Sequence, residues 1–213
     1  MHNPSLLKSI EARNQAYRQS IENPEEFWAN VAKEFTWQRK WDRVLDWNFE
    51  EPSVRWFDGA QLNITENCLD RHLPERGDEV ALIWESNSPN EESKKYTYKE
   101  LHEVVCVFAE VLRKGGIKKG DRICIYMGMV PELAIAVLAC ARVGAIHSVI
   151  FGGFSAHSVA DRVNDAQATA IITCDGAYRG AKDIPLKAII DEALQHCNSV
   201  KTVWVYERTD IEI

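Results

Sequence analysis

The sequence predicts an α/β fold, a doubly wound and mostly parallel sheet with helices on both faces, preceded by a tryptophan-rich helical and irregular N-terminal extension. Short, continuously apolar segments near residues 122, 146, 170 and 201 alternate with segments of helical period. Such strands are typical of a parallel sheet buried on both faces, and right-handed crossovers place helices on each face. The first 60 residues lack this alternation and hold five of the seven tryptophans.

Residues 1–60 are expected to form an extension that packs on a main domain made of residues 61–213. A helix is predicted over residues 23–35, because Pro24 suits a first helical position and apolar side chains recur at intervals of four. Residues 36–57 are interpreted as irregular. Their large rings are expected to bury this segment against a neighbouring core rather than to form a stacking platform for bases.

The regular pattern begins with a short buried strand over residues 79–85, followed by a polar loop over 86–95. Thr97 and Glu100 then form the T-x-x-E of a capping box, in which each side chain accepts from the other residue's backbone N–H. This box predicts a helix start. The helix carries one apolar stripe and ends at Gly115 and Gly116.

The remaining elements alternate strictly. Strands are predicted over residues 122–127, 146–151, 169–174 and 201–207. Helices are predicted over residues 131–143, from a Ser155 cap to about Ala166, and over 184–197. Each helix joins two strands, so these are βαβ units, expected to form the parallel sheet.

Composition excludes several classes. The net charge of −7 argues against nucleic-acid binding. No apolar stretch approaches the roughly 18 residues of a membrane span, and the N-terminus lacks the apolar core of a signal peptide, so a cytoplasmic protein is expected. The six cysteines stand singly without a C-x-x-C pair, which predicts neither a metal site nor disulfides but buried free thiols.

Two stretches follow strands at the edge where such sheets bind ligands. In the first, Phe151-Gly152-Gly153-Phe154 precedes a helix; glycine lets the backbone approach a ligand, but from the residues alone a plain turn is the preferred interpretation. In the second, Arg179-Gly180-Ala181-Lys182 places two cations on either side of two small residues. That pattern could clamp a phosphate monoester, but taken alone it is better interpreted as a solvated loop with two surface charges.

Other reactive side chains give no catalytic set. His147 lies in a predicted strand and is interpreted as an interior histidine, and His157 is expected to face solvent in the first turn of its helix. Asp161 and Asp165 share a helix face, which indicates a solvated surface rather than a metal pair. No catalytic residue and no metal ligand is therefore assigned within these 213 residues.

Four blocks in order, "WFDGAQLNITENCLDRHL", "YTYKEL", "LACARVGAIHSVIFGGFS" and "RGAKDIPLK", resemble the acetyl-CoA synthetases, the AMP-forming acetate–CoA ligases of the adenylate-forming superfamily. The resemblance extends from about Tyr17 to Tyr206. It implies formation of acetyl-adenylate from acetate and Mg-ATP with release of pyrophosphate, and then acetyl transfer to the thiol of coenzyme A with release of AMP.

The resemblance also assigns the two candidate stretches. Arg179, Gly180, Ala181 and Lys182 align with the segment that holds the 3′-phosphate end of coenzyme A. Phe151, Gly152 and Gly153 align with the place where the pantetheine arm passes the backbone. Lys182 stands where an arginine is common, which removes a bidentate fork, and Gly128 replaces a usual proline, which concerns loop stiffness.

The family's ATP-phosphate loop, ATP-binding aspartate, magnesium site, acyl pocket and adenylation lysine lie downstream of these residues. The chain is therefore interpreted as an N-terminal fragment that binds coenzyme A, is inactive alone, and needs the missing remainder of the ligase as its partner. An uncovered sheet edge should also favour association. Two alternatives remain: a stand-alone, non-catalytic coenzyme A or nucleotide-binding module, and a fragment of a propionate-type ligase.

Overall fold

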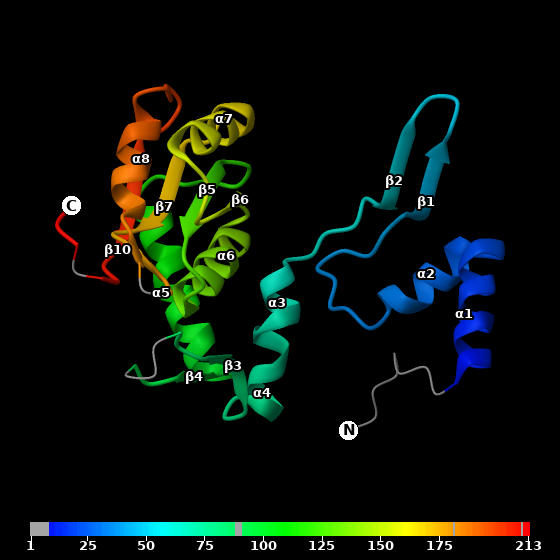
Figure 1. Cartoon of the computed structure of the whole chain (residues 1–213). Helices are drawn as coiled ribbons and strands as arrows, with labels where there is room; N and C mark the ends of the chain where they lie inside the picture. The colour runs from blue at the N-terminus through cyan, green and yellow to red at the C-terminus, as the bar shows by residue number, and fades with distance from the viewer. Residues whose placement is uncertain (1–8, 88–90, 181, 210) are drawn as a thin grey trace. The chain divides into compact units, whose positions relative to one another are not determined.

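The computed structural model describes residues 9–87, 91–180, 182–209 and 211–213. The chain separates into two compact units, Met1–Asn63 and Ile64–Ile213, each with its own internal contacts (Figure 1).

The first unit contains two helices and a β-hairpin. The helices are α1 (Ile10–Glu22) and α2 (Pro24–Ala32), and the antiparallel strands are β1 (Arg43–Asn48) and β2 (Ser53–Asp58). Pro24 starts α2 as predicted. The hairpin corrects the sequence interpretation, which took residues 36–57 as irregular. Its strands show no apolar alternation because most of their side chains are exposed on both faces.

Aromatic rings provide the apolar centre of this unit. Trp37, Trp41 and Phe57 form a closed triangle with ring centroids 5.2 to 5.5 Å apart. The Trp37 indole N–H also donates to the carbonyl oxygen of Ala32 at 2.8 Å, which ties the ring cluster to the end of α2. Ring pairs at such distances are worth about 0.5–1.5 kcal/mol beyond their buried area.

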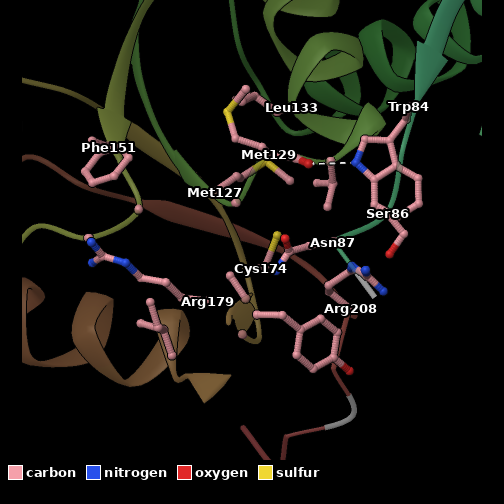
Figure 2. A pocket seen from close by; sticks show the side chains of 18 of the residues that line it. Trp84, Ser86, Asn87, Met127, Met129, Leu133, Phe151, Cys174, Arg179 and Arg208 are labelled. Carbon is pink, nitrogen blue, oxygen red and sulfur yellow. Dashed lines mark hydrogen bonds between the residues drawn. The ribbon is translucent and has the colours of Figure 1, made fainter. Parts of the chain in front are cut away.

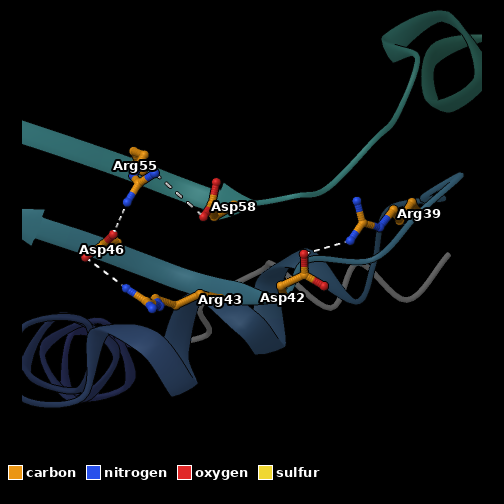
Figure 3. Close-up of polar contacts among 6 residues, drawn as sticks. All are labelled: Arg39, Asp42, Arg43, Asp46, Arg55 and Asp58. Carbon is orange, nitrogen blue, oxygen red and sulfur yellow. Dashed lines mark hydrogen bonds and ion pairs between the residues drawn. The ribbon is translucent and has the colours of Figure 1, made fainter.

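Arginine–aspartate ion pairs lie on the surface of the β1–β2 hairpin (Figure 3). Asp46 on β1 pairs with Arg43 on its own strand and with Arg55 on β2, and Arg55 also approaches Asp58 at 4.0 Å. The Arg55 side chain is 60% exposed. Exposed ion pairs contribute little because water screens them, so these pairs select the strand register more than they stabilise the unit.

The second unit opens with short helices and a small sheet. These elements are α3 (Ile64–Cys68), the 3₁₀ turn η1 (Asp70–His72), α4 (Leu73–Arg76), β3 (Val80–Trp84), β4 (Lys94–Thr97) and α5 (Tyr98–Lys114). β3 pairs with β4 in an antiparallel sheet of two strands. β3 was predicted as a buried strand, but its side chains are partly or fully exposed, and β4 lies partly in the predicted loop.

The predicted capping box starts α5. The Glu100 backbone N–H donates to the Thr97 hydroxyl at 3.2 Å, and the Thr97 backbone N–H donates to the Glu100 carboxylate at 2.8 Å. Leu101, Val105 and Leu112 on the inner stripe of the helix are buried. Local sequence therefore fixed both the start and the buried face of α5.

Four parallel strands form the central sheet, in the order β10-β7-β5-β6. They are β5 (Arg122–Met127), β6 (Ile146–Phe151), β7 (Ala170–Cys174) and β10 (Thr202–Tyr206), joined by α6 (Pro131–Val143), α7 (Ala156–Ala166) and α8 (Leu186–Leu194). α6 leads outward from β5 to β6, whereas α7 leads back past β5 to β7. Right-handed crossovers place these two helices on opposite faces, with α5 packed on α6 and α8 on α7 (Figure 1). The predicted fold class is confirmed.

The centre of the sheet is dry. Every side chain of β7 is buried, and Ile123, Cys124, Ile125 and Tyr126 of β5 are at most 1% exposed. Edge strand β6 differs, because Ile146, Val149 and Phe151 stay exposed there.

Among the described residues, no helix combines the length and the apolar character needed to cross a membrane.

Candidate functional site

A cavity of about 750 Å³ lies at the carboxyl ends of the parallel strands (Figure 2). Its walls come from the ends of β3, β5, β6, β7 and β10 with the segments that follow them, and from the hairpin of β8 (Ala177–Arg179) and β9 (Lys182–Ile184). Open α/β sheets bind ligands at this edge, because the connections there leave a crevice. Figure 2 shows Phe151 and Arg179 on one side of the cavity, and Trp84 and Arg208 on the other.

The glycine pair after β6 makes a tight turn on one wall. The Gly153 and Phe154 backbone N–H groups both donate to the Phe151 carbonyl oxygen, at 2.8 and 3.0 Å. A Cβ on Gly152 would lie 2.9 Å from the Met127 carbonyl oxygen, closer than a real Cβ approaches backbone. Gly152 is therefore required for the loop to pack against the end of β5. Both Gly152 and Gly153 also line the cavity, so the turn and the wall are the same structure.

Two aromatic rings flank this turn. Phe151 and Phe154 meet edge to face with ring centroids 5.9 Å apart, and Phe151 is 61% exposed. The buried Tyr126 of β5 donates its hydroxyl hydrogen bond to the Phe154 carbonyl oxygen at 2.7 Å. This bond fixes the turn to the centre of the sheet. An exposed apolar ring is thus held in place at the cavity wall.

The stretch after β7, predicted as a loop, is a small antiparallel hairpin. Its strands are β8 (Ala177–Arg179) and β9 (Lys182–Ile184), and Arg179 stands directly opposite Lys182. Gly180 in the turn has φ +62°, the left-handed region that favours glycine. Ala181, the fourth predicted residue here, lies outside the described residues. The hairpin places two exposed cations side by side.

The structure brings the two predicted stretches together. The Arg179 Nη1 atom lies 3.3 Å, and the Phe151 Cε1 atom 2.8 Å, from the point that a Gly153 Cβ would occupy. Phe151, Gly152, Gly153, Arg179 and Gly180 all line the cavity, whereas Lys182 is exposed on β9 and does not line it. The guanidinium, the aromatic ring and bare backbone therefore converge at one corner.

Sequence reasoning missed Asp175, which follows β7 and is 1% exposed. Its carboxylate accepts from the backbone N–H groups of Gly176, Arg208 and Thr209 at 2.6, 2.7 and 2.8 Å. Burial raises the pKa of Asp175, but these hydrogen bonds outweigh it, so the pKa lies below its usual value. Asp175 thereby ties the segment after β10 to the end of β7, a contact between residues too far apart in sequence for a motif.

Arg208 was also missed. Its guanidinium lies 5.5 Å from the Trp84 ring centroid and 5.0 Å from that of Tyr178, and it donates to the Glu91 carboxylate at 2.6 Å. Trp84 in turn donates its indole N–H to the Met129 carbonyl oxygen at 2.7 Å (Figure 2). The far wall of the cavity thus places two aromatic rings around one half-buried cation.

The histidines and aspartates considered earlier lie elsewhere. His147 on β6 is half-buried, and burial lowers its pKa. His157 is exposed and lies 3.7 Å from Asp161 on the solvent face of α7, and Asp165 is also exposed. None of them lines the cavity. Within the described parts of the chain, no three His, Cys, Asp or Glu side chains are grouped as a metal site would need.

The cysteines do not pair. Cys124, Cys140 and Cys174 are buried as predicted, whereas Cys106 and Cys197 are half-buried and Cys68 is exposed. Burial raises the pKa of the Cys124 and Cys174 thiols to about 11 and that of Cys140 to about 12. Cys174 lines the cavity, but its neutral thiol serves there as a small apolar group.

Comparison with known families now adds to this geometry. Residues 69–212 match the AMP-binding enzyme family, and residues 13–68 match the N-terminal region of acetyl-coenzyme A synthetases. The chain belongs to the AMP-binding enzyme family. Within that family, its resemblance to acetyl-CoA synthetases, inferred above from four sequence blocks, is confirmed.

Individual proteins with similar sequences or structures point to the same family. Acetyl-coenzyme A synthetase of Magnetococcus marinus is 47% identical over 98% of this chain, and acetyl-coenzyme A synthetase 2 of Pseudomonas putida is 51% identical over 91%. The solved structure of acetoacetyl-CoA synthetase from Streptomyces lividans covers 92% of this chain with a TM-score of 0.84 and 29% identity. The chain spans 30% to 32% of the length of these three proteins.

Proposed function

We propose that this chain supplies the coenzyme A-binding surface of an AMP-forming acetate–CoA ligase. The observation that carries the proposal is the convergence of Arg179 with Phe151, Gly152 and Gly153 on one cavity at the carboxyl edge of the sheet. Relatives named as acetyl-coenzyme A synthetases support the choice of coenzyme A as the ligand.

Electrostatics of the β8–β9 hairpin support an anionic ligand. Arg179 and Lys182 are opposite each other across the hairpin, and like charges in that position repel by about 0.2–1 kcal/mol. Neither side chain takes part in an ion pair among the described residues. A phosphate monoester between them would replace this repulsion with two charge-assisted contacts. In this proposal Gly180, which has open space where a Cβ would lie, lets the phosphate reach the backbone of the turn, and Ala181 is assigned to the phosphate site by the resemblance alone.

The wall beside Arg179 suits the rest of the ligand. Coenzyme A joins its nucleotide, through a diphosphate, to a narrow pantetheine arm of methylene segments and two amide groups that ends in a thiol. Phe151 offers an exposed ring, and Gly152 and Gly153 leave the adjoining wall without side chains. The arm would pass along this bare backbone after the phosphate is held at the hairpin. The chain's own residues therefore bind and orient coenzyme A, while the acetyl transfer takes place beyond them.

The whole reaction would use acetate, ATP with Mg²⁺, and coenzyme A, and would pass through acetyl-adenylate. We assign no catalytic residue and no magnesium ligand to this chain, because these functions belong to the remainder of the ligase. We therefore expect this chain alone to show no acetate-dependent ATP–pyrophosphate exchange. Measurable exchange by the purified 213-residue chain would contradict that expectation.

Titration calorimetry with coenzyme A tests the binding role. Arg179→Ala removes one charge-assisted contact to phosphate, which is worth about 1.5–3 kcal/mol, so the affinity should fall at least tenfold. Arg113→Ala is the matched control, because Arg113 is an exposed arginine on α5 that pairs with Glu110 and does not line the cavity. Equal affinities of the wild-type chain and Arg179→Ala would refute the role of Arg179.

Two other functions remain as alternatives. A stand-alone, non-catalytic coenzyme A or nucleotide-binding module would bind with useful affinity by itself. A propionate-type ligase would share this surface and differ in its acyl pocket. The acetoacetyl-CoA synthetase neighbour favours a surface common to ligases of several acids, because its fold matches this chain while its name specifies another acyl group.

A further inference from the structure

We propose that Arg208 is a positioning residue that holds the β8–β9 hairpin, and with it Arg179, at the cavity. The proposal rests on the proposed function for its ligand, but its structural part does not. Arg208 follows the last strand of the sheet and lines the cavity on the wall opposite Phe151 (Figure 2).

The guanidinium of Arg208 contacts three side chains from two regions that are far from it in sequence, the β3–β4 region and β8. It stacks near Tyr178 on β8 at 5.0 Å and near Trp84 at the end of β3 at 5.5 Å. It also donates to the Glu91 carboxylate, which lies in the connection from β3 to β4, at 2.6 Å. Its side chain is only 16% exposed, so water screens these contacts weakly.

The base of the hairpin, where Ala177 pairs with Ile184, packs against the core, so a further contact matters most for its middle and its turn. Among the described residues, β8 and β9 have three residues each and pair with one another alone, and a pair of such short strands is marginal in water without packing. Tyr178 is the middle residue of β8 and immediately precedes Arg179. A cation stacked on the Tyr178 ring therefore limits where the next side chain can lie.

The backbone of Arg208 is anchored independently of its side chain. Its N–H donates to Asp175, which also accepts from the N–H groups of Gly176 and Thr209. Gly176 immediately precedes β8, so this carboxylate fixes the start of the hairpin, and the Arg208 guanidinium fixes its middle. Replacing the Arg208 side chain leaves the Asp175 anchor intact. We therefore expect a displaced hairpin rather than an unfolded chain.

The test compares Arg208→Met, Arg208→Lys and the control Arg113→Met in the full chain. Hydrogen exchange of the backbone amides in β8 and β9 should rise about tenfold or more in Arg208→Met, with the amides of β5 unchanged. Arg208→Lys keeps a positive charge beside Glu91 but loses the planar guanidinium that stacks on the rings. Exchange of the β8 and β9 amides in Arg208→Lys should therefore be faster than in the wild-type chain and slower than in Arg208→Met. Unchanged exchange in β8 and β9 would overturn the proposal, as would an equal rise in β5.

Ligand binding gives a second readout. Coenzyme A and 3′-dephospho-coenzyme A differ only in the phosphate assigned to Arg179. Arg208→Met should weaken coenzyme A binding about five- to tenfold and change dephospho-coenzyme A binding little, because the displaced group contacts the phosphate. An equal loss for both ligands would contradict a positioning role. If the wild-type chain binds neither ligand, the proposed function fails, and the exchange measurement still decides whether Arg208 holds the hairpin.

Discussion

Asp175 offers the most quantitative test of how this edge of the sheet is held together. The carboxylate is 1% exposed and accepts four hydrogen bonds, from three backbone N–H groups and from the Thr209 hydroxyl at 3.1 Å. Asp175→Asn keeps the size of the side chain but turns one acceptor oxygen into an N–H₂ donor. The Thr209 hydroxyl can rotate to accept from that group, whereas a backbone N–H cannot.

The expected loss follows from this geometry. Asp175→Asn leaves at least one buried N–H facing a donor, and a hydrogen bond to a charged group is worth about 1.5–3 kcal/mol, so the free energy of unfolding should fall by that amount. Asp175→Ala leaves all three backbone N–H groups without their acceptor and should lower the free energy of unfolding by about 2–4 kcal/mol. The loss stays below the sum of three such bonds because water reaches part of the segment after β10. Urea titrations followed by circular dichroism measure both values.

The pH dependence has a definite sign. The folded pKa of Asp175 lies below its unfolded value, so its stabilisation is complete above about pH 4 and is lost as the pH falls through the lowered pKa. The difference between wild type and Asp175→Asn should therefore be constant near neutral pH and shrink below about pH 4. A variant as stable as wild type at pH 7, or a difference independent of pH, would refute the reasoning.

Three further predictions concern other parts of the chain. In Gly176→Ala the new Cβ would lie 2.5 Å from the Thr209 hydroxyl oxygen and 3.1 Å from the Ile184 carbonyl oxygen. This variant should therefore lower the free energy of unfolding by about 1–3 kcal/mol in the same urea titration. Unchanged stability would mean that the neighbouring residues move aside at no cost and would contradict the prediction. Alkylation of the native chain at pH 8 should modify the exposed Cys68 first and spare Cys124, Cys140 and Cys174, whose thiols are buried with raised pKa, as peptide mass spectrometry would show. In the first unit, the hydrogen bond from Arg55 lowers the pKa of Asp46. The Arg55 side chain is 60% exposed and that of Asp46 32%, so water and salt still reach the pair, and Asp46→Asn should change stability only slightly and less still at high salt. A large, salt-independent loss would contradict the screening argument.

The sequence predicted those elements whose signals are local. The capping box of Thr97 and Glu100 starts α5, Pro131 starts α6, and Gly144 with φ +76° ends that helix. The apolar runs of β5 and β7 predicted a parallel sheet because these two strands are covered on both faces, and the apolar run of the half-buried edge strand β10 extended the same pattern. Periodicity and caps suffice where one segment's own residues decide its conformation.

Elements that depend on partners elsewhere were missed. β1 and β2 lack alternation because both of their faces are largely exposed, and the ring triangle that stabilises their unit includes Trp37 and Trp41, which lie outside the strands. α1 has no buried residue, and its three large apolar side chains, Ile10, Tyr17 and Ile21, are all exposed. β8 and β9 are too short for a period of two to appear.

The residues of the candidate site also fall into those that local sequence predicted and those that it missed. Phe151, Gly152, Gly153 and Arg179 were predicted from their places after strands, and the structure brings them into one cavity. Asp175 and Arg208 were not, since their roles depend on contacts across 30 residues and more. The glycine at position 176 is the sequence signal that could have indicated the close contact between the end of β7 and the segment after β10, because a Cβ there would collide with Thr209.

Calorimetry with coenzyme A and its 3′-dephospho form on the unchanged chain tests the central claim most directly. If Arg179 and Lys182 hold the 3′-phosphate, coenzyme A should bind at least tenfold more tightly than dephospho-coenzyme A, and Arg179→Ala should remove most of that preference. Equal affinity for the two ligands, or a preference that survives Arg179→Ala, would contradict the assignment of this hairpin to the phosphate.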